Sequence, residues 1–419
     1  MDKKSNKPQG DIVAAIDVGS TKVSCFIATI EADGRPHVIG VGQLPSRGLR
    51  AGAITDMESA RESIAGAVHH AEKLADETVR SVVVNLSGGK PQSEMFALEV
   101  PISGHEVGQH DLRKVLDQGS HFQKQSDREL IHSIPIGFRI DGSRGIRDPR
   151  GMFGEKLGVD IHVISAQAGA VRNLATCIGG CHLNIEALVV SPYASGLACL
   201  VGDEMDLGVT LIDMGGGTTS IAVFEDGEIV FTDSVLIGGS AVTMDIAQGL
   251  STPVAEAERM KILYGSAKPQ AGDDQAVIDV PQIGDKDRTK ANYVPKSLVT
   301  GIVQPRLEET FELVRNRLEA SGYGKSAGRR VVLTGGASQM QGVRDLAAHI
   351  LDKHVRLGKP QRHDGLAEAV AGPAFATCAG LLTFAAQKQA DGVMAVIGKT
   401  TNGKSGVFGR LGRWIHQNF

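Results

Sequence analysis

Two short loops, about two hundred residues apart, carry residue types that bind phosphate. The first reads Asp17-Val18-Gly19-Ser20-Thr21-Lys22 and the second reads Asp213-Met214-Gly215-Gly216-Gly217-Thr218-Thr219. Glycines let a phosphate approach backbone N–H groups, and the short hydroxyls can donate hydrogen bonds to its oxygens. The Lys22 ammonium can place a point charge on a β- or γ-phosphate. Together the two loops predict a phosphate site.

An aspartate ends the apolar run before each loop, so Asp17 and Asp213 are expected to face one space. Mg²⁺ prefers such sparse carboxylate sites while it keeps several waters, and we expect it here mainly through water. A second metal candidate is weaker. Cys177, Cys181 and His182 resemble half of a zinc site, but structural zinc normally takes four ligands, so buried thiols are the favoured interpretation.

Strand-like apolar runs position both loops. Residues 12–16 and 209–212 precede them, and residues 23–30 and 220–224 follow them. A strand, a tight turn and a strand, used twice, predict two related halves that close on one nucleotide. A third turn, Gly335-Gly336-Ala337-Ser338, follows the strand-like run 331–334. One such turn is weak evidence, but the three together favour nucleotide binding over unrelated glycine turns.

Composition limits the possible classes. The 419 residues, 42% of them hydrophobic, are enough for two or more packed domains. The net charge of -4 provides no global basic field, so no nucleic-acid partner is expected. The five cysteines, an odd number in apolar contexts, indicate reduced thiols. No apolar run reaches the roughly 20 residues that a membrane-spanning helix needs.

Further elements follow from periodicity and turn residues. Residues 59–76 show helical spacing with Asp56 or Thr55 as a cap, and residues 81–86 form a strand. Residues 87–162 change to short alternating strands around a polar helix near 111–124, which predicts an inserted subdomain. A second insert spans about 240–304 and has a polar middle. Helices are expected from about 305 to 321 and from 371 to 387.

The three turns resemble those of the actin/Hsp70/sugar-kinase superfamily, whose two lobes clamp ATP. This resemblance implies that Gly335, Gly336, Ala337 and Ser338 lie along the adenosine, and that Gly238 and Gly239 approach the phosphates or ribose. It also implies that Glu258 and Lys261 contact ribose and adenine, because they match the Glu-x-x-Lys of chaperone-type members. Taken alone, Glu258 and Lys261 are better explained as part of an exposed helix face.

Three further segments look like the bacterial cell-division family FtsA: residues 48–56, 148–157 and 257–265. The resemblance covers about 11–387 and the C-terminal tail. It implies an α/β, actin-like two-lobed ATPase fold with an FtsA-type inserted subdomain in the first lobe and a C-terminal amphipathic helix. The implied parts are a lobe 1 core (11–86, 163–190, 371–395), the insert (87–162), a lobe 2 core (191–240, 305–370), a second subdomain (241–304), a flexible linker (396–405) and the tail (406–419).

The tail has the composition of a helix that lies in a membrane interface. Its apolar residues fall on one helical face and its basic residues lie around that face: Val407, Phe408, Arg410, Leu411, Arg413, Trp414, Ile415 and Phe419. Anionic lipids would add attraction for the arginines. The alternative is a helix that docks on this protein or on a partner.

Hydrolysis of ATP needs a group that activates water. The Hsp70-like pattern would place Glu where this chain has Ser191, and nothing places Glu186 or Gln167 on the γ-phosphate. We therefore expect tight ATP binding with slow or negligible hydrolysis. No residue is predicted to be catalytic.

The resemblance implies a protein that polymerises on the cytoplasmic face of the inner membrane at the division septum, tethers FtsZ there and helps recruit later divisome proteins. The FtsZ C-terminal tail would dock on 241–304, where Arg288, Lys290 and Lys296 could meet an acidic peptide. Self-association and recruitment would involve 87–162. The alternatives are an actin-fold small-molecule kinase or an Hsp70-like ATPase, and a pilus-assembly or cell-shape actin relative. The order of the inserts argues against a cell-shape protein.

Overall fold

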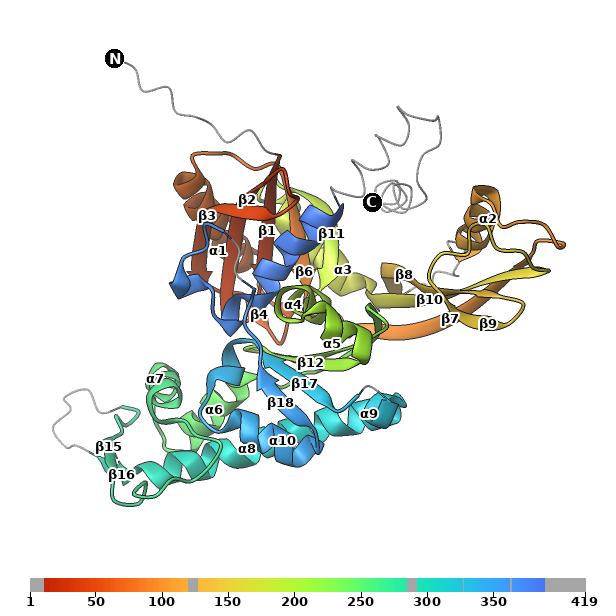
Figure 1. Cartoon of the computed structure of the whole chain (residues 1–419). Coiled ribbons are helices and arrows are strands. Elements are labelled where there is room, and N and C mark those ends of the chain that lie inside the picture. The colour runs from red at the N-terminus through yellow and green to blue at the C-terminus, as the bar shows by residue number, and fades with distance from the viewer. Residues whose placement is uncertain (1–10, 120–126, 285–291, 327, 362–363, 389–419) are drawn as a thin grey trace, which may run out of the picture.

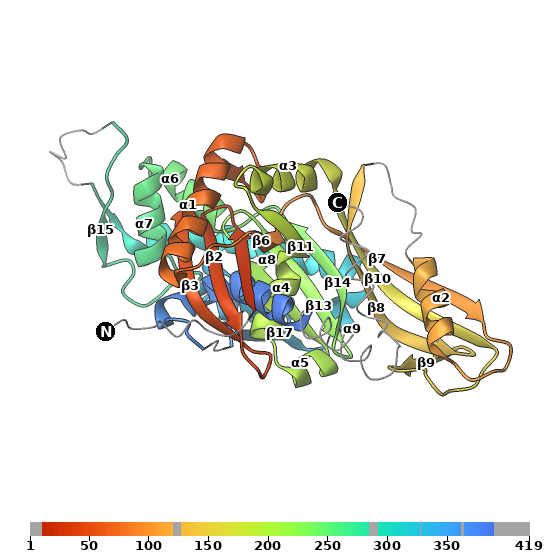
Figure 2. The same ribbon diagram turned by 90° about the horizontal axis from the view of Figure 1, so that it is seen from above.

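The computed structural model describes residues 11–119, 127–284, 292–326, 328–361 and 364–388. Two lobes lie one above the other, and an arm formed by residues 92–167 extends to one side (Figure 1). Seen from above, the arm points away from both lobes (Figure 2). The linker 396–405 and the tail 406–419 lie outside the described residues.

The two lobes contain five-stranded sheets of the same topology. Their orders are β11-β6-β1-β2-β3 and β14-β13-β12-β17-β18. In each sheet three strands form an antiparallel meander, and two more strands continue from its first strand in parallel. The upper strands are β1 (Ile12–Val18), β2 (Lys22–Ile30), β3 (Pro36–Pro45), β6 (Ser81–Leu86) and β11 (Asn184–Val190). The lower strands are β12 (Val209–Met214), β13 (Thr219–Glu225), β14 (Glu228–Val235), β17 (Arg330–Thr334) and β18 (His354–Leu357).

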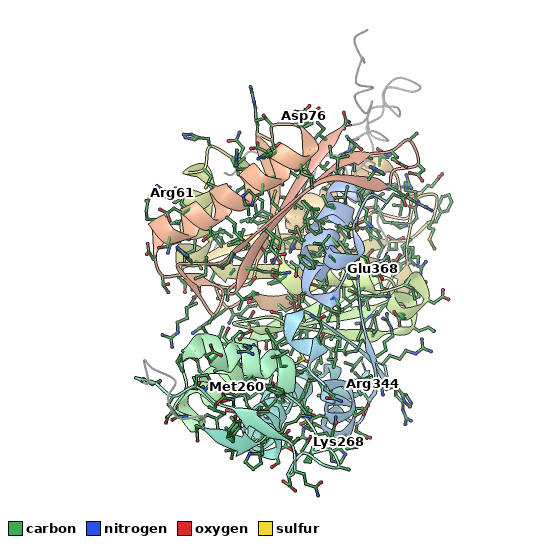
Figure 3. The ribbon with its side chains drawn as sticks, turned by 90° about the vertical axis from the view of Figure 1, so that its left-hand side faces the viewer. Arg61, Asp76, Met260, Lys268, Arg344 and Glu368 are labelled. Atoms are coloured by element: carbon green, nitrogen blue, oxygen red, sulfur yellow. The ribbon has the colours of Figure 1, made fainter. Side chains whose placement is uncertain are left out.

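Helices cover the sheets of both lobes. The upper lobe has α1 (Met57–Ala75), α3 (Ala168–Gly179) and a helix over residues 376–388. The lower lobe has α6 (Gly239–Gly249), α7 (Val254–Tyr264), α8 (Lys296–Ala320), α9 (Tyr323–Ser326) and α10 (Val343–Leu351). Figure 3 shows Arg61 on α1 and Asp76 just after its C-terminal end in the upper lobe, with Met260, Lys268 and Arg344 in the lower lobe and Glu368 on the segment between them.

Helix α1 shows how the sequence specifies such an element. Its N-cap Asp56 accepts hydrogen bonds from the backbone N–H groups of Glu58 and Ser59. Its buried face carries Ala60, Ser63, Ile64, Ala67, Val68 and Ala71, at the helical spacing that predicted it.

The arm is a four-stranded sheet covered by one helix. Its strands, in the order β7-β10-β8-β9, are β7 (Gln92–Pro101), β10 (Lys156–Gln167), β8 (Arg128–Ile140) and β9 (Ser143–Ile146), and its helix is α2 (Gln109–Gly119). It has its own apolar core around Leu157, Val159 and Ile161. Strand β10 runs without a break from the arm to the upper lobe, so the expected boundary at residue 162 falls inside a strand.

Two helices connect the lobes. Helix α4 (Ser191–Cys199), followed by α5 (Gly202–Leu207), leads from β11 to β12, and the helix over residues 376–388 crosses α4. A Cβ added at Gly380 would lie 1.7 Å from the carbonyl oxygen of Ala194, so these two helix backbones are in direct contact. The buried apolar cluster of the upper lobe continues through this crossing to Leu211 and Phe224 in the lower sheet.

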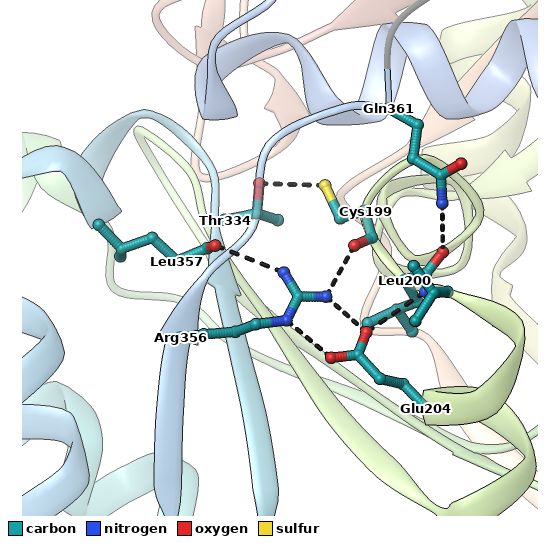
Figure 4. A network of polar contacts seen from close by, with 8 residues as sticks. Cys199, Leu200, Glu204, Thr334, Arg356, Leu357 and Gln361 are labelled. Atoms are coloured by element: carbon teal, nitrogen blue, oxygen red, sulfur yellow. Dashed lines mark hydrogen bonds and ion pairs between the residues drawn. The ribbon is translucent and has the colours of Figure 1, made fainter.

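A polar network joins β18 to α5 beside this crossing (Figure 4). The Nε of Arg356 donates a hydrogen bond of 2.7 Å to the Glu204 carboxylate. The Nη2 of Arg356 donates one of 2.9 Å to the carbonyl oxygen of Cys199. Gln361 donates to the carbonyl oxygen of Leu200 at 2.8 Å. The chain segment that returns to the upper lobe is thus fixed to the segment that left it.

Two predicted helix starts were wrong. The helix expected from residue 371 begins at residue 376, after a 3-10 turn over residues 373–375. Helix α8 begins at Lys296, not near residue 305, and Pro305 lies inside it. A proline within a helix removes one hydrogen bond and clashes with the carbonyl of the turn before it, so the packing of α8 must offset this cost. The first turns also bury Val299, Thr300 and Val303, which holds them against the lower lobe.

The described residues also form several short elements. These are two hairpins, β4 (Leu49–Arg50) with β5 (Ala53–Ile54) and β15 (Val277–Asp279) with β16 (Tyr293–Pro295), and three 3-10 turns, η1 (Gly336–Gln339), η2 (Glu368–Val370) and η3 (Pro373–Phe375). Within the described ranges no helix is both long enough and apolar enough to span a bilayer.

Candidate functional site

A cavity of about 500 Å³ lies between the two lobes, where the predicted loops meet. This volume is within the range of small-molecule and cofactor sites. Twelve of the predicted nucleotide-site residues line it: Asp17, Gly19, Ser20, Thr21, Lys22, Asp213, Gly215, Gly216, Thr218, Glu258, Gly335 and Gly336. The structure therefore brings together three turns that are far apart in the sequence.

The two phosphate loops touch each other at the floor of this cavity. A Cβ added at Gly216 would lie 2.4 Å from Cγ2 of Thr21, and one at Gly217 would lie 2.5 Å from Oγ of Ser20. Only glycines permit this approach, so the glycines of the second loop serve the contact between the lobes as well as access to the backbone. Gly217 itself does not line the cavity, whereas Gly216 does.

The first carboxylate, Asp17, belongs to a buried hydrogen-bond network. The Asn85 amide donates to Oδ1 of Asp17 at 2.7 Å, while its oxygen accepts from the backbone N–H of Val18 at 2.6 Å. The same amide nitrogen lies 2.9 Å from Oγ of Ser87 and 3.1 Å from Oγ of Ser191. Asn85 thus fixes both the carboxylate and the strand that carries it.

The second carboxylate, Asp213, is held from the crossing helices. Ser195 on α4 donates to Oδ2 of Asp213 at 2.5 Å, and Thr377 on the helix over residues 376–388 donates to the same oxygen at 3.1 Å. The two hydroxyls also lie 2.9 Å apart. The position of Asp213 therefore depends on how the two connecting helices cross.

Burial raises the pKa of both carboxyl groups. The pKa of Asp17 rises to about 7, because desolvation outweighs the attraction of nearby Lys22, and the charge of Asp213 raises it further. The pKa of Asp213 is also raised by burial, against the hydrogen bonds from Ser195 and Thr377. Two buried carboxyls that favour protonation are a suitable pair for a divalent cation, whose charge would favour their ionised form.

The Lys22 ammonium also lines the cavity. It lies 3.1 Å from the centroid of the Phe375 ring. Burial lowers the pKa of Lys22 to about 8, although Asp17 opposes this effect, so most Lys22 side chains remain charged at neutral pH. This cation is placed to meet a phosphate.

Helix α7 and the third turn also line the cavity. Glu258 lines the cavity, and its Oε2 accepts hydrogen bonds from Thr243 at 2.5 Å and from Lys261 at 2.7 Å. Lys261 itself does not line the cavity. Its ammonium donates instead to Glu258, Thr243 and the carbonyl oxygen of Gly239 at 3.1 Å. Of the predicted Glu-x-x-Lys pair, only the glutamate faces the space where a ligand could lie.

Five other predicted residues support the site without lining it. The backbone N–H of Gly239 donates to the carbonyl oxygen of Gly215 at 2.9 Å, and a Cβ at Gly238 would lie 2.6 Å from that oxygen, so this pair braces the second phosphate loop. Thr219 donates to the carbonyl oxygen of Ile237 at 2.8 Å. The remaining two residues, Ala337 and Ser338, are buried in the third turn. Ser338 donates a hydrogen bond of 2.8 Å to the carbonyl oxygen of Gly335.

Sequence reasoning missed several residues of the site. Those that line the cavity are Gln43, Ser87, Ser220, Ile262, Pro373, Ala374, Phe375 and Thr377. The segment 373–377 was read as part of a small-residue helix, and only its Gly-Pro start could have signalled a turn that passes the cleft. Asn85 was missed because one asparagine in an apolar strand has no motif around it.

The residue at the position that the Hsp70-like pattern gives to glutamate is Ser191, the first residue of α4. Its Oγ lies 2.9 Å from Oγ of Ser87, and both serines line the cavity. Glu186 and Gln167 are exposed and do not line it. Gln43 lines it from β3, where sequence reasoning placed no site residue.

The cysteines form no metal site in the described part of the chain. Cys177 and Cys181 are free thiols, and burial raises the pKa of Cys177 to about 11. No cluster of three or more His, Cys, Asp and Glu side chains that could hold a metal occurs among the described residues. Asp17 and Asp213 could therefore hold Mg²⁺ only if waters or ligand oxygens complete its coordination.

Comparison with solved structures defines the class of fold. The chain is similar to a PilM-PilN type IV pilus biogenesis complex, with a TM-score of 0.63 and 17% identity over 89% of this chain and 98% of that one. It is also similar to MreB5 of Spiroplasma citri bound to ADP, with a TM-score of 0.51 and 14% identity over 94% of this chain and 100% of that one. The predicted actin-like fold is confirmed.

Sequence comparison defines the family. The family model "Cell division protein FtsA" matches residues 210–380, and "SHS2 domain inserted in FTSA" matches residues 88–165, which form the arm. A cell division protein FtsA from Rhizobium meliloti (strain 1021) is 44% identical over 97% of this chain and 95% of that protein. The chain belongs to the cell division protein FtsA family of actin-like proteins.

Proposed function

We propose that the cavity binds ATP with Mg²⁺. The observation that carries this proposal is the meeting of three glycine-rich turns, a half-buried lysine and two buried carboxyl groups around one cavity between the lobes. Ser20, Thr21, Thr218 and Lys22 would contact the phosphates, and Glu258 and Gly336 would lie at the nucleoside end. Asp17 and Asp213 would hold Mg²⁺ through water. The similar fold of MreB5 bound to ADP supports a nucleotide in this cleft.

ATP hydrolysis is proposed to be slow or negligible. The serine pair Ser87 and Ser191 cannot act as a base at neutral pH without help, and Glu258 is held by Thr243 and Lys261. The nucleotide then acts as a structural ligand, which stabilises the closed arrangement of the lobes. Steady-state turnover as fast as that of an active kinase would refute this proposal.

The function supported best is that of a membrane-bound polymer that tethers FtsZ at the division septum. Membership of the FtsA family supports the role in cell division. Membrane attachment is proposed for residues 406–419, on the cytoplasmic face of the inner membrane. A single interfacial helix binds weakly, so self-association would supply avidity.

The partner surfaces are proposed from the family resemblance. The FtsZ C-terminal tail would dock on residues 241–304, and later divisome proteins would meet the arm, about residues 87–162. Arg288 and Lys290 lie outside the described residues. Lys296 already pairs with Asp273 at 3.0 Å, so it would have to exchange this carboxylate for an acidic peptide.

Vesicle co-sedimentation tests the function. The full chain, with ATP and FtsZ, is expected to sediment with vesicles containing anionic lipid and to bring FtsZ with it. Deleting residues 405–419 should leave both proteins in the supernatant, and vesicles of neutral lipid are the matched control. If the shortened chain sediments with the vesicles as well as the full chain does, membrane attachment through residues 406–419 is refuted. Phosphorylation of a soluble small molecule would favour a kinase instead.

A further inference from the structure

Lys22 and Phe375 form a cation–π contact at the cavity. The ammonium of Lys22 lies 3.1 Å from the centroid of the Phe375 ring, and both side chains line the cavity. No hydrogen bond or ion pair of this ammonium occurs within the part of the chain that the structure describes. The ring is therefore its principal direct partner there.

The ring of Phe375 is itself firmly held. It is buried and stacks on Phe26, with ring centroids 6.1 Å apart and ring planes inclined by 21°. Lys22 and Phe26 are four residues apart on β2, so they lie on one face of the strand. The backbone just before the ring is fixed to the lower lobe, because the carbonyl oxygen of Pro373 accepts from the N–H of Gly335 at 3.2 Å.

An aromatic face suits a cation that must remain available to an anion. A carboxylate partner would neutralise the ammonium, whereas the quadrupole of a ring attracts it without cancelling its charge. The neighbouring carboxyl group of Asp17 attracts Lys22 electrostatically. Because the ring holds the ammonium, it opposes the formation of an ion pair between Lys22 and Asp17. The Asp17 carboxyl group then keeps its hydrogen bond from the Asn85 amide.

We propose that Phe375 is a positioning residue that holds the Lys22 ammonium for the terminal phosphates of a bound nucleotide. Phe375 then contributes to the preference for a nucleoside triphosphate over a nucleoside. This inference rests on the proposed binding of ATP. It adds a residue from the segment between the lobes to a site otherwise built from the three glycine-rich turns.

The test compares Phe375→Leu and Phe375→Tyr with the wild-type full chain. Affinities for Mg·ATP and for adenosine are measured by calorimetry. Phe375→Leu should weaken ATP roughly 3- to 30-fold, which is the worth of a partly desolvated cation–π contact, and should change adenosine less than about twofold. Phe375→Tyr keeps an aromatic face and should retain the wild-type ratio. Equal losses for both ligands, or no loss of ATP affinity, would overturn the proposal.

A double-mutant cycle shows whether Phe375 acts through Lys22. In a Lys22→Met background, Phe375→Leu should cause no further loss that is selective for ATP. A full additional loss would mean that Phe375 acts by another route, and would overturn the inference. If Phe375→Leu does not fold, Phe375→Met carries the same test. Failure of wild-type protein to bind ATP would refute the proposed function, whereas wild-type binding without a selective loss would refute only this inference.

Discussion

The crossing of the two connecting helices makes Gly380 highly sensitive to one added methyl group. A Cβ there would lie 1.7 Å from the carbonyl oxygen of Ala194, and real Cβ atoms essentially never come within 3.0 Å of such an atom. In Gly380→Ala the helices must therefore separate by roughly 1.3 Å, in a core packed as densely as an organic crystal. Overpacking of this kind costs about 1–3 kcal/mol.

The separation would also disturb the polar contacts at the crossing. Ser195 follows Ala194, and its hydroxyl lies 2.9 Å from that of Thr377 on the other helix. Each hydrogen bond lost there costs about 1 kcal/mol, while alanine recovers up to about 1 kcal/mol of helix propensity. Gly380→Ala should thus be less stable by about 3 kcal/mol. Its ATP affinity should fall too, because Asp213 depends on both hydroxyls.

The matched control is Gly301→Ala, at an exposed position in the second turn of α8, where nothing other than the helix's own backbone lies within 4 Å of the added Cβ. This variant should be more stable by about 0.5–1 kcal/mol, because alanine loses less backbone entropy in a helix. Both variants are measured by guanidinium unfolding followed by circular dichroism. A Gly380→Ala protein as stable as wild type would refute the close crossing.

Three further predictions concern stability. His162 is buried, its Nδ1 donates to the carbonyl oxygen of Ile229 at 2.8 Å, and burial lowers its pKa to about 4. Protonation therefore favours the unfolded chain, and wild-type stability should fall by up to about 3 kcal/mol as pH drops from 6.5 to 4. In His162→Gln, denaturant unfolding at a series of pH values should show a slope smaller by one proton, and an unchanged slope would contradict the assignment. Asp56→Ala removes the N-cap of α1 and should lower the denaturant midpoint in the same unfolding assay; an unchanged midpoint would show that the cap does not stabilise α1. Glu204→Gln leaves the Arg356 guanidinium without its carboxylate and should cost about 2 kcal/mol, less than a fully buried pair because Arg356 is partly exposed; unchanged thermal unfolding would argue against this connection.

Local patterns predicted much of this structure because they depend on neighbouring residues. The apolar runs before Asp17 and Asp213 are buried strands, and the helical spacing after Asp56 is α1. The predicted start of α8 lay too far along the chain, because Pro305 is a strong local signal for a helix start. The burial of Val299 and Val303, which is a property of the whole lobe, outweighs that signal.

Local sequence patterns likewise predicted part of the site but not the contacts between distant residues. Glycine-rich turns identified the residues that line the cavity from both phosphate loops. Contacts between distant residues could not be read from the chain: Asn85 with Asp17, Thr377 with Asp213 and Phe375 with Lys22. Lys261 matched a motif yet turns to Glu258 and Gly239, because local hydrogen-bond acceptors decide where its ammonium lies.

The most direct test of the account is the binding of Mg·ATP to the purified full chain. Calorimetry is expected to show saturable binding of one nucleotide per chain, and Asp213→Asn should weaken it at least about tenfold, since the magnesium site then loses half of its protein charge. Absence of saturable binding at millimolar ATP, or an unchanged affinity in Asp213→Asn, would contradict the assignment of the cavity between the two phosphate loops.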